Sequence, residues 1–389
     1  MKLRVVLASV YFYPYMAGGV EWYILNLSRE LVKLGVEVHI FTTDEGADRE
    51  PPFPSQELDG IEIHRFKTPL NLSYRLKVWS GLREELMRDR FDLIHLFDYP
   101  QYHTIIGTRI AQRLGRPSVI TVFDVHSMVP RPFYKQVPMV LFDALLAKGV
   151  LNSASRVLVR APQLIGRLEQ IGVNPSRMTV TPSGVRREEL AKASGKGFRK
   201  KYSTGEHMIL YLGRLHPMKG PQYLIRALPE VLRRVPDTTL ILVGPDDQGY
   251  QSYLEKVVRD LCVSGNVRFT GPIYADQERM QAYSACDVFC LPSGYEGTSQ
   301  SIFQAMAQGK PVVATNVGGI PSQVTHESEG LLVPYRDPSA LASSILRLLE
   351  DPNLARKMSA AARRRAEAFC YDRLAKQMKG IYEGLIESS

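Results

Sequence analysis

The stretch LPSGYEGTSQSIFQAMAQGKPVVATNVGGIP, residues 291–321, decides the fold class. An apolar strand ending at Pro292 leads through a glycine-containing loop into a helix that begins near Thr298 or Ser299, and a second apolar run follows at 311–317. A loop that opens onto a helix N-terminus offers N–H groups and the positive end of the helix dipole, which suits a diphosphate. The stretch therefore predicts a strand–loop–helix unit of an α/β sheet with an anion-binding loop.

The same alternation of strand and helix extends in both directions. Apolar runs predict strands at 3–10, 36–43, 92–97, 117–123 and 156–161, and again at 207–215, 238–245, 266–273, 287–292 and 311–317. Helical spacing predicts the intervening helices, among them 20–35, 221–235, 251–263, 276–285 and 299–309. Asp337-Pro338 supplies an N-cap followed by proline at the first helical position, which predicts a further helix over 338–350. Strands that are apolar on both faces and alternate with helices indicate parallel sheets covered by helices.

The length of 389 residues exceeds the size at which one core usually keeps growing, so two domains are expected. The segment 183–206 has no strand pattern and is rich in glycine, serine and charge, which is typical of a connection. We therefore expect a doubly wound domain over 1–185, a linker over 186–206 and a second such domain over 207–365. Ligands of such sheets bind at strand ends, here in a cleft between the domains.

Composition narrows the class of protein. Hydrophobic residues make up 44% and charged residues 23%, as in an ordinary globular protein. Four scattered cysteines fit neither a disulfide framework nor a zinc spacing, so we expect a reducing cytoplasm and, for Cys286 and Cys290, buried packing. No leader or apolar span of about 18 residues is apparent.

The net charge of +9 leaves several partners open. A solvated basic surface, anionic substrates and an anionic membrane face are all compatible with it. No basic run is interleaved with aromatic residues, so nucleic acid is not an expected partner.

Charged and polar residues near predicted strand ends are candidates for a ligand site. Glu296 lies in the loop before a helix, where its carboxylate can accept hydrogen bonds from ligand hydroxyls. Gln304 lies about two turns along that helix, and its alternative role is a polar residue on an apolar helix face. Arg214 and Lys219 follow the strand at 207–215, where two cations can neutralise a diphosphate. Their alternative role is that of two solvated residues in a turn.

Glycines mark two further strand ends. Gly18 and Gly19 follow the first strand and precede a helix, so the backbone there can approach a ligand closely. A plain turn is the alternative. Gly213 stands directly before Arg214 in the sequence Gly-Arg-Leu-x3-Lys-Gly.

Taken together, these motifs resemble the donor-binding signature of the retaining GT-B glycosyltransferases of family 4, the group 1 glycosyl transferases. The matching residues are Glu296, Ala305-Met306-Ala307, Gly309, Pro311-Val312-Val313, Gly318-Gly319, Gly213-Arg214-Leu215, Lys219-Gly220, and Gly18-Gly19 with Glu21. The resemblance covers essentially the whole chain. It implies the GT-B fold, in which two Rossmann-like doubly wound domains face a central cleft.

The resemblance also implies a donor and its contacts. The donor is a nucleoside-diphosphate sugar linked to UDP or GDP, bound by the second domain with no metal or other cofactor. Glu296 is expected to hold the hydroxyls of the transferred sugar. Backbone amides of Gly297, Thr298 and Ser299 are expected to contact the sugar and the phosphates.

The same resemblance implies that catalysis is electrostatic. Arg214 and Lys219 stabilise the leaving nucleoside diphosphate as the glycosidic bond breaks. Family members carry a glutamate that binds the ribose hydroxyls at the position of Gln304. A glutamine carbonyl still accepts one such bond, without the strength that the charge adds.

The first domain departs from the family pattern near its fourth strand. Family members usually have a histidine directly after that strand, and this chain reads Thr121-Val122-Phe123-Asp124-Val125-His126. Phe123 occupies the histidine position, so His126 is the candidate catalytic residue, with an exposed loop histidine as the alternative. His95 matches a strand-end pattern whose role in the family is largely structural.

Two further segments have expected roles. The apolar stretch 132–151 is either a helix packed on the first sheet or an amphipathic surface for a lipid-linked acceptor, with peripheral contact to the inner membrane face. The segment 366–389 resembles the closing helix of the family, which returns to the first domain with Phe369, Tyr371 and Tyr382 as packing residues.

The expectation is a metal-independent retaining glycosyltransferase of the hexosyltransferase type, with an acceptor that the sequence leaves open. A non-catalytic nucleotide-sugar-binding protein on the same fold is the alternative. Gln304 and Phe123 favour that alternative, whereas Glu296, Arg214 and Lys219 argue against it. A sugar-nucleotide epimerase would need a pair of acid and base carboxylates, and no convincing pair is present.

Overall fold

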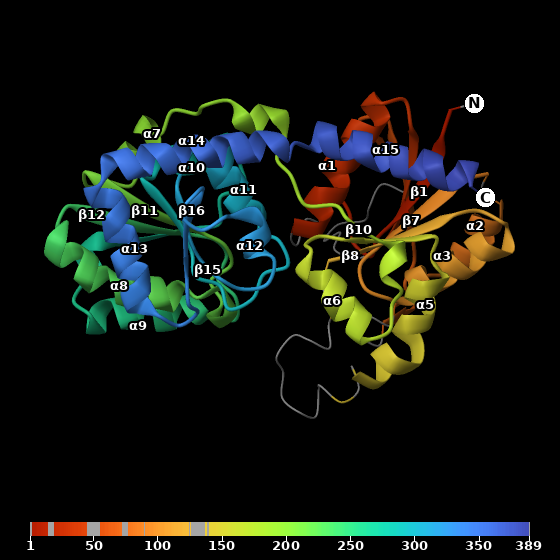
Figure 1. Ribbon diagram of the computed structural model, residues 1–389, viewed down its shortest axis with the longest axis horizontal. Coiled ribbons are helices and arrows are strands. Elements are labelled where there is room, and N and C mark those ends of the chain that lie inside the picture. Colours follow the sequence, from red (N-terminus) through yellow and green to blue (C-terminus); the bar gives the residue numbers. More distant parts are fainter. Residues whose placement is uncertain are drawn as a thin grey trace. The chain divides into compact units, whose positions relative to one another are not determined.

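The computed structural model describes residues 2–14, 19–44, 55–71, 77–88, 90–123, 125, 137 and 140–388. The chain divides into two compact units, of which unit 1 comprises Met1–Ser183 and Tyr371–Ser389 and unit 2 comprises Gly184–Cys370. Each unit has a parallel sheet with helices on both faces (Figure 1). The prediction of two Rossmann-like α/β domains is confirmed.

Unit 1 is built on a sheet with the strand order β10-β9-β8-β7-β1-β2-β4-β3. Its strands are β1 (Arg4–Ala8), β2 (Glu37–Thr43), β3 (Ser55–Leu58), β4 (Ile61–Phe66), β7 (Leu93–Phe97), β8 (Ser118–Val122), β9 (Arg156–Val159) and β10 (Met178–Val180). Neighbouring strands are parallel except β3 and β4, which form an antiparallel hairpin at the edge. Short strands β5 (Leu70–Asn71) and β6 (Lys77–Val78) pair separately.

Helices cover both faces of this sheet (Figure 1). The core on one face includes α1 (Gly19–Lys33) and α15 (Tyr371–Glu387). The core on the other face includes α2 (Leu82–Arg88), α3 (Tyr102–Arg113), α5 (Lys148–Ser153) and α6 (Gln163–Gln170). A π-helical turn η2 (Asp143–Ala147) leads into α5, and a 3-10 turn η3 (Pro175–Arg177) precedes β10.

Unit 2 has a parallel sheet with the order β13-β12-β11-β14-β15-β16. Its strands are β11 (His207–Leu212), β12 (Thr238–Val243), β13 (Val267–Gly271), β14 (Val288–Leu291), β15 (Val312–Thr315) and β16 (Gly330–Val333). The chain leaves β11 in both directions along the sheet, so the carboxyl ends of β11 and β14 form the switch point at which such folds bind ligands.

The helices of unit 2 also form two layers (Figure 1). One layer contains α8 (Pro221–Arg234), α9 (Tyr250–Asp260) and α13 (Pro338–Glu350). The other contains α7 (Lys196–Lys201), α10 (Asp276–Ala285), α11 (Gln300–Ala307) and α14 (Pro352–Ala368). The short elements are α12 (Ile320–Gln323) and the 3-10 turns η4 (Arg187–Leu190), η5 (Pro217–Lys219) and η6 (Ser264–Asn266).

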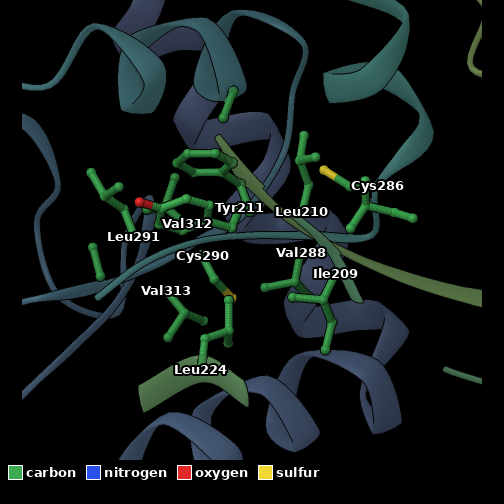
Figure 2. Close-up of a cluster of buried hydrophobic side chains, with 14 of the residues drawn as sticks. Ile209, Leu210, Tyr211, Leu224, Cys286, Val288, Cys290, Leu291, Val312 and Val313 are labelled. Atoms are coloured by element: carbon green, nitrogen blue, oxygen red, sulfur yellow. The ribbon is translucent and has the colours of Figure 1, made fainter. Parts of the chain in front are cut away.

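The core of unit 2 consists of apolar strand residues and the helices on either side. Figure 2 shows side chains of β11, β14 and β15 packed together, with Leu224 of α8 beneath them. Cys286 and Cys290 lie in this core as free thiols, as predicted. Burial raises the pKa of Cys286 to about 12, so it remains a protonated packing residue.

The ends of unit 2 differ in detail from the expected domain scheme. Residues 186–206, expected as a linker, contain η4 and α7 and fall within unit 2. Leu190 and Phe198 are buried in its core, which anchors this segment. At the other end, Phe369 packs on unit 2, whereas Tyr371 and Tyr382 are buried in unit 1.

Among the described residues, no helix combines the length and the apolar character needed to cross a membrane.

Candidate functional site

The loop after β14 places a carboxylate and an ammonium group together. Glu296 is only 8% exposed. Its Oε1 accepts hydrogen bonds from Lys219 Nζ and from Ser293 Oγ, each at 2.7 Å. Within the described part of the chain no donor reaches Oε2 of Glu296, so that oxygen remains able to accept from a ligand hydroxyl. The structure therefore brings the predicted residues Glu296 and Lys219 into direct contact.

Two glycines explain why the loops around Glu296 come so close. Gly220 has φ +74°, and a Cβ there would lie 2.0 Å from the carbonyl oxygen of Pro292. Gly318 has φ +53°, and its Cβ would lie 2.0 Å from the carbonyl oxygen of Glu296, which also accepts a hydrogen bond from Gly319 N. Any side chain at either glycine would push these loops apart, so both positions require glycine. The loops after β11, β14 and β15 are thus held together through their backbones.

Arg214 follows β11 and is paired across the loop. Its Nη1 donates to Asp247 Oδ2 at 2.9 Å, while its side chain stays 57% exposed. The preceding Gly213 lies against Gly244, where a Cβ would meet the Gly213 carbonyl oxygen at 1.9 Å. Asp247 thus orients the guanidinium group and leaves most of it open to solvent, where a phosphate can reach it.

A buried tyrosine supports the Arg214 backbone. The hydroxyl of Tyr211 donates to the carbonyl oxygen of Arg214 at 2.7 Å. Burial, reinforced by the negative charge of Glu296, holds the pKa of Tyr211 well above its usual value. The hydroxyl therefore remains a donor at all ordinary pH values.

The N-terminus of α11 differs in part from the predicted phosphate contact. Ser299 is the N-cap, and its Oγ accepts from Ile302 N. Its own N–H donates to Gln323 Oε1 at 2.7 Å, so that amide already has a partner. For Gly297 and Thr298 the described residues offer no acceptor to the amide. These two amides, rather than all three that the sequence predicted, are available to a ligand.

Both polar atoms of the Gln304 side-chain amide have hydrogen-bond partners. Its Nε2 donates to Glu189 Oε1 at 2.7 Å, and its Oε1 accepts from the hydroxyl of Tyr283 at 3.2 Å. Glu189 is 3% exposed and is also held by Arg186 at 3.1 Å. A glutamate at position 304 would face a second buried carboxylate, which costs free energy unless one of them binds a proton. Glu189 was not identified from the sequence, because nothing local signals a partner 115 residues away.

The predicted residues of unit 1 are only partly described. Gly18 and His126 lie outside the described residues, as does Asp124. Gly19 is the first residue of α1, and a Cβ there would meet nothing within 4 Å. Among the described residues, none would obstruct a side chain beside the N-terminus of α1, where Glu21 occupies the first turn.

His95 lies inside unit 1, in β7. Its two ring nitrogens contact Tyr382 Oη and Thr121 Oγ1, each at 2.6 Å. Burial lowers the pKa of His95 to about 3, with a smaller effect from the charge of Arg160, so the ring is neutral. These contacts fit the structural role that the family resemblance implied.

An aromatic group with one arginine lies at the ends of β8 and β9. Phe123 packs edge-on against Tyr23, with ring centroids 5.6 Å apart. The guanidinium carbon of Arg160 lies 3.8 Å from the Tyr23 ring centroid, and its Nη1 donates to the carbonyl oxygen of Thr181. Burial lowers the pKa of Arg160. Arg160 was not identified from the sequence, because it follows the apolar strand run directly and has no charged neighbour in sequence.

The stretch 132–151 has an exposed apolar part. Residues 131–136, 138 and 139 lie outside the described residues, but the helical turns that follow are described. Val140, Leu141 and Leu145 are exposed, Leu145 to 81%. Ala147 and Leu151 of the same stretch are buried in the core of unit 1, so the stretch packs on the sheet and also exposes apolar side chains.

Comparisons with known proteins cover both units. Residues 17–189 match the family model described as Glycosyltransferase Family 4, and residues 196–365 match the one described as Glycosyl transferases group 1. A D-inositol 3-phosphate glycosyltransferase from Kineococcus radiotolerans is 28% identical, over 99% of this chain and 96% of that protein.

Solved structures share the fold over the full length. Sucrose-phosphate synthase from Thermosynechococcus elongatus is similar with a TM-score of 0.82 and 25% identity, covering 100% of both chains. Anabaena HepE in complex with UDP and glucose is similar with a TM-score of 0.80 and 21% identity, over 98% of this chain and 100% of that one. The family models match both domains, and the relatives share the fold and most of the length of the chain. The chain therefore belongs to the GT-B glycosyltransferases of the family 4 type.

Proposed function

We propose that this glycosyltransferase transfers a hexosyl residue from a UDP- or GDP-linked sugar with retention of configuration and without a catalytic metal. The observation that carries the proposal is the contact between Glu296 and Lys219 on loops fixed by glycine. The HepE structure with UDP and glucose belongs to the same fold, which supports a nucleotide-sugar donor.

The donor binds to the carboxyl ends of β11 and β14 in this proposal. Arg214 and Lys219 neutralise the diphosphate, and the amides of Gly297 and Thr298 at the start of α11 add donors to it. Glu296 Oε2 accepts hydrogen bonds from hydroxyls of the transferred sugar. Lys219 has two tasks, since it positions Glu296 and carries positive charge toward the phosphates.

The reaction breaks the bond between the anomeric carbon and the diphosphate oxygen and forms a bond to the acceptor oxygen on the same face. The acceptor proton passes to a phosphate oxygen of the leaving group. The charge that develops on the diphosphate is stabilised by Arg214 and Lys219, which act without moving during the step. No side chain becomes covalently linked to the sugar.

Ribose recognition differs from the family pattern in this proposal. Gln304 already donates to Glu189 and accepts from Tyr283, so its carbonyl has one lone pair left for a ribose hydroxyl. The ribose therefore adds less to affinity here than in relatives with a glutamate.

The acceptor binds to unit 1, and a lipid-linked acceptor is favoured. Val140, Leu141 and Leu145 expose apolar area, and Lys148 follows on α5. Apolar side chains beside a basic one, on a chain of net charge +9, suit peripheral contact with an anionic membrane surface.

A non-catalytic nucleotide-sugar-binding protein is the second candidate. The occupied amide of Gln304 and the packing of Phe123 against Tyr23, where relatives have a histidine, are the observations that favour it.

One experiment tests both candidates. The protein is incubated with a panel of UDP-, GDP- and ADP-sugars, with and without membrane lipid extract, and with EDTA. Mass spectrometry should find one donor converted to a nucleoside diphosphate plus a glycosylated or hydrolysed product, at a rate unchanged by EDTA. Donor that binds but is never converted contradicts the transferase proposal and supports the binding protein.

A further inference from the structure

Three side chains with metal-ligating atoms meet on strands β2 and β4 of unit 1. His39 comes from β2, and Glu62 and His64 come from β4. The parallel register places His39 beside Glu62 and Phe41 beside His64, so these side chains share one face of the sheet. Their ligand atoms all lie within 4.8 Å of one another.

The separations suit one small cation. His39 Nδ1 lies 3.1 Å from His64 Nε2 and 3.3 Å from Glu62 Oε2, and His64 Nε2 lies 3.8 Å from Glu62 Oε2. Zinc holds nitrogen and oxygen ligands at about 2.0–2.2 Å in a tetrahedron, whose edge is then about 3.4 Å. The observed separations lie on both sides of that value, so little movement is needed to bring all three atoms onto one ion.

A carboxylate behind His39 orients its ring. His39 Nε2 lies 2.9 Å from Glu37 Oε1. Arg4 Nε also lies 3.0 Å from this Nε2, so the nitrogen faces both a carboxylate and a donor. In the tautomer that binds zinc, Nε2 carries the proton and donates to Glu37, and the lone pair of Nδ1 points toward His64 and Glu62. Metal-ligating histidines almost always donate their other ring N–H in this way. The same hydrogen bond lowers the pKa of Glu37, with a smaller contribution from the charge of Arg4.

The surrounding charges leave the cluster open to a cation. Arg4 Nε lies 3.0 Å from Glu37 Oε1, so its charge is compensated. Glu57 of β3 stands opposite Glu62 in the hairpin register and adds a second carboxylate to that face. The side chain of His39 is 1% exposed, that of His64 25% and that of Glu62 56%. The cluster therefore has a buried, fixed ligand and two ligands that solvent reaches.

We propose that His39, His64 and Glu62 form a zinc-binding site that joins β2 to β4. Two imidazoles and one carboxylate suit zinc and its neighbours in the first transition row, whereas magnesium and calcium prefer oxygen ligands throughout. Zinc binding requires His64 to present Nε2 without a proton, and the ring then carries its proton on Nδ1. Water fills the fourth position. The ion stabilises the hairpin edge of the sheet.

The test uses the full-length chain without a histidine tag, first treated with EDTA and dialysed. Titration with zinc chloride in a calorimeter should give one saturable site per chain, and the unfolding temperature should rise with zinc concentration. Magnesium chloride should produce neither effect.

Variants assign the site. Glu62→Gln and His64→Asn remove one ligand each at partly exposed positions, and we expect zinc affinity to fall on the order of 100-fold or more. Glu37→Gln keeps all three ligands and loses only the orienting carboxylate, so affinity should fall about 10- to 100-fold with unchanged stoichiometry. Glu84→Gln removes an exposed charge of α2 in the same unit and should bind zinc like the unaltered protein.

Two outcomes would overturn the proposal. One is the lack of a saturable zinc signal in the unaltered protein. The other is zinc binding that survives undiminished in both Glu62→Gln and His64→Asn, which would place the ion elsewhere, for example on the exposed Cys262. Urea unfolding without zinc checks that each variant is folded, so a lost signal is not a folding defect.

Discussion

The two sheets end in different chemistry although both follow the same parallel plan. In unit 2 the carboxyl ends of the strands carry charged side chains in pairs, Glu296 with Lys219 and Arg214 with Asp247. In unit 1 the ends of β8 and β9 carry Phe123 and the buried Arg160. One edge is a set of charged side chains on loops fixed by glycine, and the other is a buried aromatic cluster, because Tyr23 and Arg160 are 0% and 1% exposed.

The charged edge has the composition that its proposed ligand requires. A diphosphate requires fixed positive charge and backbone donors whatever the rest of the ligand is, so its site is built from a small set of residues. The aromatic cluster of unit 1 packs into the core instead, and many residue combinations can fill a core. Substitutions at the charged edge should therefore change turnover and ligand binding. Acid, which protonates buried histidines, should reduce the stability of unit 1 first.

Loss of the Glu296 carboxylate should have the largest effect. In Glu296→Gln we expect turnover to fall roughly 100- to 1,000-fold, the usual size for one electrostatic contact made in the transition state. Initial rates with the preferred donor measure it. Glu278→Gln is the matched control. It removes a glutamate of α10 that pairs with Lys201, and it should keep full activity. Full activity of Glu296→Gln would remove Glu296 from the site.

Loss of both cations should come next. Arg214→Ala combined with Lys219→Ala should weaken binding of the nucleoside diphosphate roughly 100-fold or more, since each charged hydrogen bond contributes about 1.5–3 kcal/mol. Calorimetry with UDP and GDP measures the loss. A control pair, Arg226→Ala with Lys201→Ala, removes the same charge from α8 and α7 and should bind normally. Equal weakening in both pairs would mean that net charge alone attracts the ligand.

Acid should destabilise unit 1 through two buried histidines. Burial lowers the pKa of His95 to about 3 and that of His103 to about 4, whereas the unfolded chain titrates near 6.5. The unfolded state therefore binds more protons below pH 6.5, and stability present above that pH is lost as the pH falls toward 3. From pH 7 to pH 5 the loss should be roughly 2 kcal/mol for each histidine.

Urea unfolding at several pH values tests this dependence. His95→Asn should lose about half of the slope between pH 7 and pH 5. His207→Asn, at the partly exposed start of β11, should leave it unchanged. A slope that does not respond to His95→Asn would mean that other groups cause the acid sensitivity.

The smallest expected effect concerns Gln304. Gln304→Glu places a second carboxylate against Glu189 and should reduce the free energy of unfolding by roughly 1–2 kcal/mol. The double variant Glu189→Gln with Gln304→Glu restores one charge and one amide, and it should recover most of that loss. Urea unfolding of the unaltered protein, Gln304→Glu, Glu189→Gln and the double variant gives the coupling energy. If Gln304→Glu is as stable as the unaltered protein, Glu189 is not a constraint on this position.

Residues whose role depends on chain-local rules were predictable. The helix at 338–350 was predicted from Asp337-Pro338 and coincides with α13, where Asp337 caps the amide of Ala340. The apolar runs of both sheets gave strands to within a few residues, because buried parallel strands are apolar on both faces. The motifs that contain Lys219 and Glu296 directly follow the neighbouring strands β11 and β14, which agrees with the contact between the two residues.

Residues defined by distant partners were not predictable. Glu189 becomes part of the site only through Gln304, and Arg160 gains its meaning from Tyr23 and Thr181. Neither pairing leaves a local pattern in sequence. The departure at Gln304 was visible, but its physical reason required the structure.

The hairpin of β3 and β4 was missed although the sequence carries a signal for it. Asp59 and Gly60 have φ +54° and +77°, the conformation of the tight turn that Asp-Gly favours. The strands on either side are partly exposed and polar on one face, so they lack the continuous apolar runs that indicate buried strands. The proposed zinc ligands Glu62 and His64 lie on this hairpin and were missed with it.

The position of α15 has a consequence for synthesis of the protein. Tyr382 reaches His95 across 287 residues of chain, and α15 lies against α1. Unit 2 is continuous in sequence, so it can finish folding on the ribosome while unit 1 still waits for its last helix. A chain that stalls before residue 371 exposes the apolar side of α1, including Tyr23 and Leu27. Chaperones and proteases can recognise that surface, so docking of α15 also protects α1 from them.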